Sequence, residues 1–312
     1  MTRFPTANIA DFEASPALRQ LLASLRAQHG ESVNAIVAYG SCLRSGELFD
    51  GLLDLYLISD DYRGAYSNSA LVLANWLLPP NVFYCEVAHE GRTLRTKYAL
   101  ISRLDFQKYC SHARFESYIW GRFAQPVSIL WCRDQTSRQA IENCLLEAVR
   151  TFLGSCLPSF PASGSVAFLW SQGLALSYAT ELRSERSGRA QELAEASSAH
   201  FAEVTRLVSG SLEFPFSVYN AGGELCYQAQ VPRRRRRLAA ANWMLRRGLG
   251  KLMSILRLLK ALFTFAGGLD YIAWKLERHS GQEVVIPERV RRFPLVFLWG
   301  FCWRLYRRGI FK

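Results

Sequence analysis

A glycine and a serine stand side by side at the end of one apolar run, and an aspartate stands inside the next. Gly40 and Ser41 follow the run 34–39, and Asp54 lies thirteen residues after Ser41, within 52–59. A glycine at a strand-to-helix turn lets backbone amides approach a phosphate chain, and the hydroxyl and the helix N-terminus add donors. A carboxylate on the adjacent strand would hold Mg²⁺ against the same phosphates. The spacing indicates nucleotidyl transfer from a nucleoside triphosphate, although a Gly-Ser turn and an ion-paired aspartate also occur for structural reasons alone.

A second carboxylate two positions after Asp54 would share its side of the strand, because strand side chains alternate. Tyr56 occupies that position. Either one metal ion is held firmly, or the second ligand comes from another element. Glu86 in the run 82–87 is the first candidate for that ligand, and the next candidates are Glu47 and Asp50.

The elements that position these residues follow from hydrophobic periodicity. Apolar, β-rich runs alternate with helical patterns up to residue 133, which predicts an α/β catalytic domain over 1–134. Beyond it, helical patterns predict a mainly helical second domain over 135–232, with its boundary in the Gly- and Pro-containing stretch 220–232. The predicted strands are 34–40, 52–59, 82–87, 93–102 and 126–131, and the predicted helices are 15–27, 66–77, 104–123, 137–154, 165–183 and 187–209.

The last quarter of the chain is strongly basic. Residues 233–312 hold 19 Lys/Arg and 4 Asp/Glu, whereas the preceding residues hold 19 and 22. One helical face collects leucines and Phe263, and the opposite half collects cations, which is typical of a helix lying in a membrane interface. Packing of the leucine face on the protein's own core is the alternative. The leucines are 245, 249, 252, 256 and 259, and the cations are Arg246, Arg247, Lys251, Arg257 and Lys260.

Aromatic and basic residues continue this pattern to the C-terminus, where Trp299, Trp303 and Tyr306 alternate with basic pairs. Aromatic rings at headgroup depth and cations near anionic lipid favour peripheral membrane contact for 233–312. The N-terminal residues contain no apolar signal core, and no two cysteines have the spacing of a metal or redox motif. We therefore expect a peripheral protein at the cytoplasmic face of a bacterial inner membrane, with the mitochondrial matrix side as the weaker alternative.

The wider sequence resembles the mitochondrial translocator-assembly-and-maintenance family of phosphatidate cytidylyltransferases over most of residues 30–210. That family also lacks the second strand carboxylate, which agrees with Tyr56. Two features depart from it: Glu86 stands where the family has an amide, and the C-terminal segment is more basic and aromatic, as in a bacterial-looking member. The blocks that carry the resemblance are AYGSCLR, LLDLYLISDDYRGAY, NVFYCEV, RTKYALIS, YIWGRFAQPVSIL and LALSYATELR.

The resemblance implies a nucleotidyltransferase-like α/β domain, a helical or winged-helix-like second domain and a peripheral C-terminal helix. It also implies the reaction of CTP with phosphatidate, which yields CDP-diacylglycerol and pyrophosphate with Mg²⁺ as cofactor. Such an enzyme must hold a soluble triphosphate and an insoluble lipid together. A phosphate-binding head and a separate membrane-resting tail meet that need, so we expect deletion of 238–312 to leave CTP binding intact.

Site roles follow from the matching blocks. Each of three residues also has a purely structural alternative. Lys97 would then be an exposed cation on a strand, Arg122 would pair with Glu116, and Glu181 would pair with Arg183. The predicted catalytic residues are Asp54, Lys97 and Arg122, and the predicted CTP-binding residues are Tyr39, Gly40, Ser41 and Arg183. The predicted metal ligands are Asp54 and Glu86, from their strand positions, and Glu181, which stands where the family has an acid and would bind a metal or position the cytidine.

A cluster after the basic helix is the candidate phosphatidate headgroup site. Lys275, Arg278 and His279 lie on or beside one helical face, although a solvated, ion-paired face explains such clusters as well. Two other functions compete with the lipid enzyme. One is a nucleotidyltransferase acting on another lipid phosphate or on RNA, and the other is a non-catalytic membrane adaptor on a degenerate fold. Because the first 232 residues are mildly acidic and the basic ones are interleaved with Trp, Leu and Phe, we expect no nucleic-acid partner.

Overall fold

The computed structural model describes residues 4–7, 15–182, 188–264 and 284–292, with single positions among 273–307. Its centre is a mixed five-stranded sheet with the strand order β3-β4-β2-β1-β5. Strands β2 and β4 run parallel, and the other neighbours run antiparallel. The strands are β1 (Val33–Tyr39), β2 (Leu53–Ser59), β3 (Asn81–His89), β4 (Arg92–Ser102) and β5 (Val127–Cys132).

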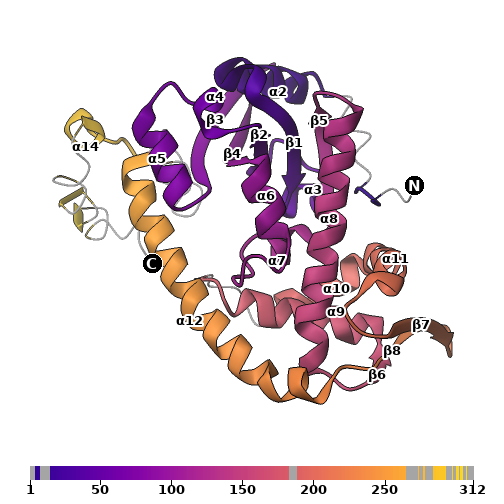
Figure 1. Cartoon of the computed structure of the whole chain (residues 1–312). Coiled ribbons are helices and arrows are strands. Elements are labelled where there is room, and N and C mark those ends of the chain that lie inside the picture. Colours follow the sequence, from indigo (N-terminus) through magenta and orange to yellow (C-terminus); the bar gives the residue numbers. More distant parts are fainter. Residues whose placement is uncertain are drawn as a thin grey trace.

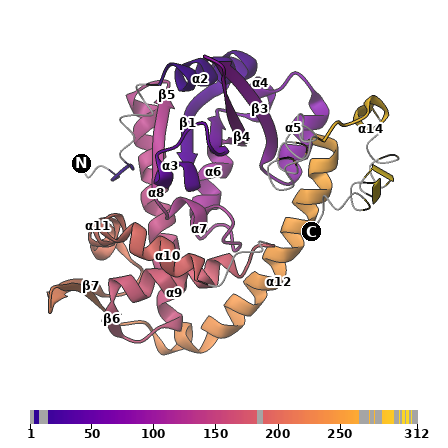
Figure 2. The same cartoon turned by 180° about the vertical axis from the view of Figure 1, so that it is seen from behind.

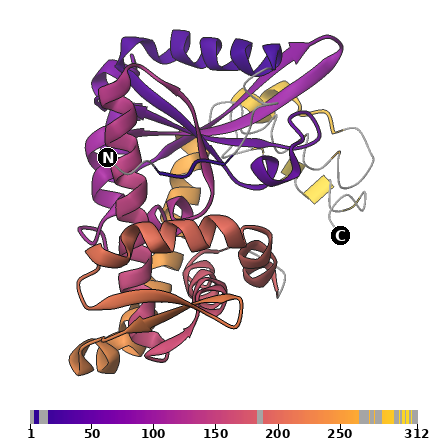
Figure 3. The ribbon, with the colours of Figure 1, turned by 90° about the vertical axis from the view of Figure 1, so that its right-hand side faces the viewer.

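Helices cover both faces of this sheet (Figure 3). On one face lies α2 (Pro16–His29), which begins where the Ser15 side chain accepts a hydrogen bond from the Leu18 amide and packs its leucines on the sheet. On the other face lies α8 (Gln135–Cys156), capped by Asp134. The predicted helix 104–123 is two helices, α6 (Arg103–Cys110) and α7 (Trp120–Phe123). The shorter helices are α3 (Ser41–Ser45), α4 (Tyr62–Ala65), α5 (Ser69–Leu77) and α14 (Glu288–Arg292), and 3₁₀ turns span Gly30–Ser32, Leu157–Ser159 and Ser209–Ser211.

The second unit is less purely helical than its sequence predicts. It contains α9 (Val166–Tyr178), α10 (Arg189–Ala196) and α11 (Ser198–Val208), and it adds a three-stranded sheet of order β6-β8-β7. The predicted boundary 220–232 instead contains most of a hairpin, because Gly222 and Gly223 adopt the positive φ of a tight turn. One hydrophobic core runs from the sheet through α8 to α9 and α11, without a break at residue 134. The three strands are β6 (Ser163–Ser165), β7 (Phe216–Ala221) and β8 (Glu224–Ala229).

Helix α12 (Arg233–Thr264) crosses the outside of the molecule and ends beside α5 (Figures 1 and 2). Its orientation argues against packing of the leucine face on the protein's own core, because the helix turns Arg246, Arg257 and Lys260 rather than its leucines toward the protein. Arg246 donates to the Phe115 carbonyl, and Arg257 pairs with the buried Glu116. Of the six apolar residues on the predicted face, Leu249 is half-buried, and the exposed ones are Leu245 (62%), Leu252 (51%), Leu256 (39%), Leu259 (52%) and Phe263 (72%).

Backbone carbonyls explain this orientation. Lys260 donates to the carbonyls of Leu78 and Pro80, just beyond α5, and Arg236 donates to that of Phe160. These oxygens lie beyond the ends of secondary-structure elements, where cationic side chains satisfy them well. Within the described residues, no helix combines the length and apolarity needed to cross a bilayer.

Candidate functional site

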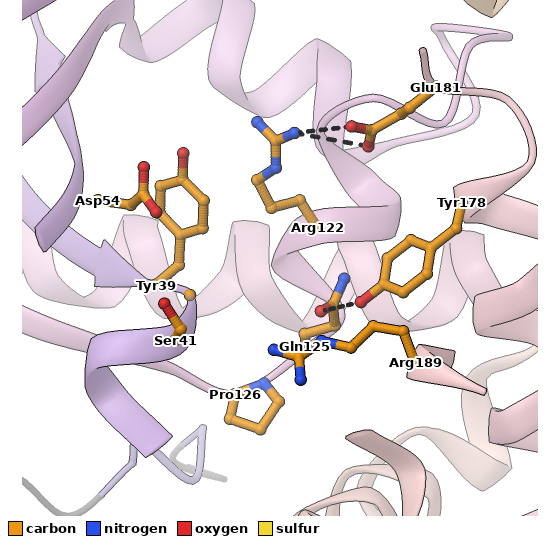
Figure 4. Close-up of a pocket in the computed structure, with 10 residues that line it drawn as sticks. Tyr39, Ser41, Asp54, Arg122, Gln125, Pro126, Tyr178, Glu181 and Arg189 are labelled. Atoms are coloured by element: carbon orange, nitrogen blue, oxygen red, sulfur yellow. Dashed lines mark hydrogen bonds and ion pairs between the residues drawn. The ribbon is translucent and has the colours of Figure 1, made fainter. Parts of the chain in front are cut away.

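A polar cavity of about 240 Å³ lies where one end of the sheet meets α7 and the C-terminal end of α9 (Figure 4). The strand register places residues of three strands side by side at this end of the sheet, because Asp54 of β2 pairs with Tyr39 of β1 on one side and with Lys97 of β4 on the other. Directly paired residues project to the same face of a sheet. The lining residues are Tyr39, Gly40, Ser41, Asp54, Arg122, Gln125, Pro126, Tyr178, Glu181 and Arg189.

Gly40 allows the turn and the carboxylate to lie close together. Its φ is +94°, and a β-carbon built there would lie 3.1 Å from Asp54 Oδ2. Any other residue would be strained and would crowd the carboxylate. Helix α3, which begins at Ser41, is only five residues long, so its dipole contributes less than the sequence suggests. The predicted Gly40, Ser41 and Asp54 cluster is therefore present, with a hydroxyl and a carboxylate as its polar groups.

Asp54 has one loosely held cationic neighbour. Its Oδ1 lies 3.8 Å from Lys97 Nζ, and the two side chains are 23% and 35% exposed. An ion pair at this distance and with this solvent exposure is weak, so the Asp54 carboxylate can bind another cation. Lys97 lies beside the cavity, which fits its predicted role of neutralising charge near Asp54.

Arg122 is the strongest fixed charge of the site. Its side chain is 9% exposed and lies 3.2 Å from Glu181 Oε2. The guanidinium also lies over the rings of Tyr39 and Tyr118 and donates to the Tyr56 hydroxyl. Burial alone would lower the pKa of Arg122, but the Glu181 carboxylate and the tyrosines raise it above its usual value. Arg122 therefore stays protonated, and it lines the cavity while its charge is balanced on one side by Glu181.

One predicted partnership is different in the structure. Glu116, the alternative partner of Arg122, pairs with Arg257 of α12 at 2.7 Å. Glu181 binds Arg122 through both carboxylate oxygens, and Arg183, its predicted alternative partner, lies outside the described residues. Arg122 and Glu181 are 59 residues apart, a separation at which no local pattern indicates pairing.

Glu86 does not join Asp54. Its carboxylate accepts from the Tyr84 hydroxyl on the edge strand β3 and from Arg95 on the adjacent strand β4. Lys97 lies between Asp54 and Tyr84 in the register, so the Asp54 and Glu86 backbones are roughly 12 Å apart. Glu47 and Asp50 lie in the loop before β2, outside the cavity lining.

Asp54 is the carboxylate of the cavity that suits a magnesium ion. Among the described residues, no group of three or more His, Cys, Asp or Glu side chains is suited to hold a metal ion. Mg²⁺ is usually held by one or two carboxylates and otherwise by substrate phosphates and water. Asp54, facing the cavity beside Ser41, suits a metal that arrives with a triphosphate, whereas Glu181 is already neutralised by Arg122.

Some lining residues were not singled out by sequence reasoning. The Tyr178 hydroxyl donates to Gln125 Oε1 at 3.0 Å, and Gln125 Nε2 donates to the Gly121 carbonyl at 2.7 Å. Gln125, Pro126 and Tyr178 stand within the family-like blocks, which were the available signal, whereas Arg189 opens a charged helix with no such signal. The predicted Arg183, Lys275, Arg278 and His279 lie outside the described residues.

Comparisons with known proteins add a loose structural likeness. No family model matches the chain, and no curated protein does. Among solved structures, the chain is similar to a nucleotidyltransferase-like protein from Exiguobacterium sibiricum 255-15, with 13% identity, coverage of 94% of this chain and 91% of the other, and a TM-score of 0.26. An overlap this loose carries no residue roles, so the site rests on its own geometry.

Proposed function

We propose that this chain is a CTP-dependent nucleotidyltransferase that uses phosphatidate as acceptor and forms CDP-diacylglycerol and pyrophosphate. One observation carries the proposal. A single cavity holds the Gly40-Ser41 turn, the available carboxylate of Asp54 and the desolvated guanidinium of Arg122. Nucleotidyl transfer needs these groups together, because a metal-bearing triphosphate and an anionic acceptor must meet there. The choice of CTP and phosphatidate rests on the sequence resemblance.

In the proposed reaction, a phosphatidate oxygen attacks the α-phosphorus of CTP. The new phosphorus–oxygen bond forms while the bond to the β-phosphate oxygen breaks, and pyrophosphate leaves with that electron pair. A phosphate monoester has its second pKa near 6, so the acceptor is largely dianionic at neutral pH and needs no protein base. The residues therefore position the reactants and neutralise charge rather than move a proton.

Each residue then has one task. Arg122 would bind phosphate oxygens from the cavity wall, Ser41 would donate its hydroxyl to the triphosphate, and Lys97 would balance charge beside Asp54. When Mg²⁺ is bound, held on the protein side by Asp54, it supplies neutralisation of the charge that develops at phosphorus. Positioning and electrostatic stabilisation account for most catalysis in transfers of this kind.

The outer face of α12 supports the lipid side of the proposal. A surface helix ordinarily buries its apolar stripe, yet α12 binds the protein through Arg246, Arg257 and Lys260 and exposes its leucines. An anionic membrane surface, such as the cytoplasmic face of a bacterial inner membrane, would cover that apolar face. The +15 charge of 233–312 would add electrostatic attraction to the lipid.

Pyrophosphate release tests the proposal. The purified protein is incubated with Mg²⁺ and each of the four nucleoside triphosphates, with and without phosphatidate in mixed micelles. We expect release with CTP that depends on phosphatidate. Absence of release with every nucleotide would contradict the enzyme and favour the adaptor, and release that ignores lipid but responds to RNA would favour a nucleic-acid substrate.

A further inference from the structure

The loop between α6 and α7 connects α12 to the cavity. Two of its consecutive residues bind α12, since the Phe115 carbonyl accepts from Arg246 Nε at 2.8 Å and Glu116 Oε1 accepts from Arg257 Nη2 at 2.7 Å. The Glu116 and Arg257 side chains are 9% and 10% exposed, so this ion pair is buried. The same loop leads directly into α7, which bears Arg122.

Tyr118, at the end of this loop, contacts two guanidinium groups. Arg257 Cζ lies 4.0 Å from its ring centroid, and Arg122 Cζ lies 4.5 Å from the same centroid. Although burial raises the pKa of Tyr118, Arg122 and Arg257 together lower it below its usual value. Each guanidinium has its own carboxylate, Glu181 for Arg122 and Glu116 for Arg257, so the two cations are neutralised separately. The ring is thus a shared surface for one cation of α12 and one cation of the site.

A second contact of α12 lies beside Glu181, the other member of the Arg122–Glu181 ion pair. A β-carbon at Gly250 of α12 would lie 2.5 Å from the Thr180 carbonyl oxygen, so the helix backbone packs directly against Thr180. The Thr180 hydroxyl is 2.7 Å from that of Ser117, in the α6–α7 loop. Thr180 immediately precedes Glu181, so α12 contacts both sides of the Arg122–Glu181 pair without entering the cavity.

We infer that α12 is part of the construction of the anion site, and that Arg257, acting through Tyr118, is a positioning residue for Arg122. This inference deepens the proposed function, on which it rests for the identity of the anion as a nucleoside triphosphate. It also changes the domain interpretation. Residues 233–312 are then not a separable membrane tail, and deletion of 238–312 would damage nucleotide binding rather than leave it intact.

The planar guanidinium of Arg257 can be replaced without loss of its charge, which tests the inference without unfolding the chain. Lysine at position 257 keeps the positive charge beside Glu116 but lacks the flat group that stacks on a ring. Arg257→Lys should therefore retain stability while it releases Tyr118. Arg26→Lys is the matched control, because Arg26 Cζ also lies 4.7 Å over an aromatic ring, that of Trp131, and lines none of the cavity. At Tyr118, substitution by Leu removes the ring on which both guanidinium groups stack.

Two measurements are made on the full chain. The first is the affinity for CTP with Mg²⁺ by calorimetry, which we expect to weaken roughly tenfold in Arg257→Lys and Tyr118→Leu. Arg26→Lys should stay within about threefold of the wild type. The second is the ¹⁵Nε–¹Hε NMR signal of Arg122 without nucleotide, identified by its loss in Arg122→Lys. We expect this signal to shift in Arg257→Lys and Tyr118→Leu and to stay in place in Arg26→Lys.

The outcomes separate the two proposals. If the wild type binds none of the four triphosphates, the proposed function fails, and the Arg122 signal alone decides the role of Arg257. An unmoved Arg122 signal in Arg257→Lys, with unchanged CTP affinity where CTP binds, would show that Arg257 only anchors the helix and would overturn the inference. Equal changes in Arg257→Lys and Arg26→Lys would indicate general loosening and would overturn it as well.

Discussion

At the scale of single residues, the site separates two kinds of charge. Arg122 is buried and paired, so its position is set by neighbours that do not move with the ligand. Asp54 is partly exposed and, among the described residues, its cationic neighbour is Lys97 at 3.8 Å, so this carboxylate can take a new cation. A fixed guanidinium and an available carboxylate in one cavity therefore serve different steps, recognition of phosphate and retention of its metal.

Asp54→Asn should abolish turnover and leave the fold intact. The amide keeps the size of the carboxylate but loses the charge that would hold Mg²⁺, so we expect pyrophosphate release to fall by at least 100-fold, on the order seen when an electrostatic catalytic group is lost. The Lys97 contact is long and solvated, so the melting temperature should barely change. Unchanged turnover would remove Asp54 from the site.

Glu86→Gln tests the correction that the structure makes to the metal ligands. Glu86 binds Tyr84 of β3 and Arg95 of β4, and in the sheet register Lys97 stands between Asp54 and Tyr84, two residues before Glu86. We therefore expect turnover within about threefold of the wild type and an unchanged dependence of the rate on Mg²⁺ concentration. A raised Mg²⁺ requirement in this variant would restore Glu86 to the metal site.

At the scale of elements, α12 shows how a helix can bind a protein through its cations. Lys260, near its end, donates to the carbonyls of Leu78 and Pro80. Burial, together with nearby Arg257, lowers the pKa of Lys260 to about 7. An unfolded chain would keep this lysine protonated up to about pH 10.4. The junction between α12 and the segment after α5 should therefore respond to alkaline pH.

The direction of that response follows from proton binding. Between about pH 7 and pH 10.4 the unfolded chain binds the Lys260 proton more tightly than the folded chain, so this group makes the free energy of unfolding rise with pH. The largest possible slope is about 1.4 kcal/mol per pH unit. Urea unfolding of the wild type and of Lys260→Met at pH 6.5, 8 and 9.5 checks this prediction. The free energy of unfolding of the wild type should rise relative to that of the variant as pH rises. A constant difference between the two proteins would show that Lys260 titrates normally.

At the scale of the whole molecule, one long helix spans both units and leaves an apolar face uncovered (Figure 1). Leu259→Ser with Phe263→Ser should weaken binding to phosphatidylglycerol vesicles roughly 10- to 100-fold, because each change removes apolar groups that would enter the interface. Leu104→Ser is the control, since Leu104 is 59% exposed on α6. Vesicle cosedimentation measures the effect, and equal losses in both proteins would argue against α12 as the contact surface.

Much of the architecture could be predicted from local signals. Alternating apolar runs predicted all five strands of the main sheet to within a few residues, because side-chain alternation and burial act within a single strand. The Gly40-Ser41 turn and Asp54 were also predicted together, since a turn glycine and a strand carboxylate are local features. The small second sheet was not predicted, because its strands are short and β6 joins β8 from more than fifty residues away, although β7 and β8 form a local hairpin.

Partner choice and helix orientation required the tertiary structure. Arg122 has acidic residues near it in the sequence, yet it pairs with Glu181 because the fold brings α7 beside the end of α9. Helix α12 has one apolar and one basic face, and its periodicity is the same whichever face turns inward. The surface it crosses presents carbonyl oxygens and Glu116, and these acceptors bind Arg246, Arg257 and Lys260, whereas Arg247 and Lys251 stay exposed. Sequence by itself therefore determined the elements and their chemistry, whereas long-range contacts decided which charges meet.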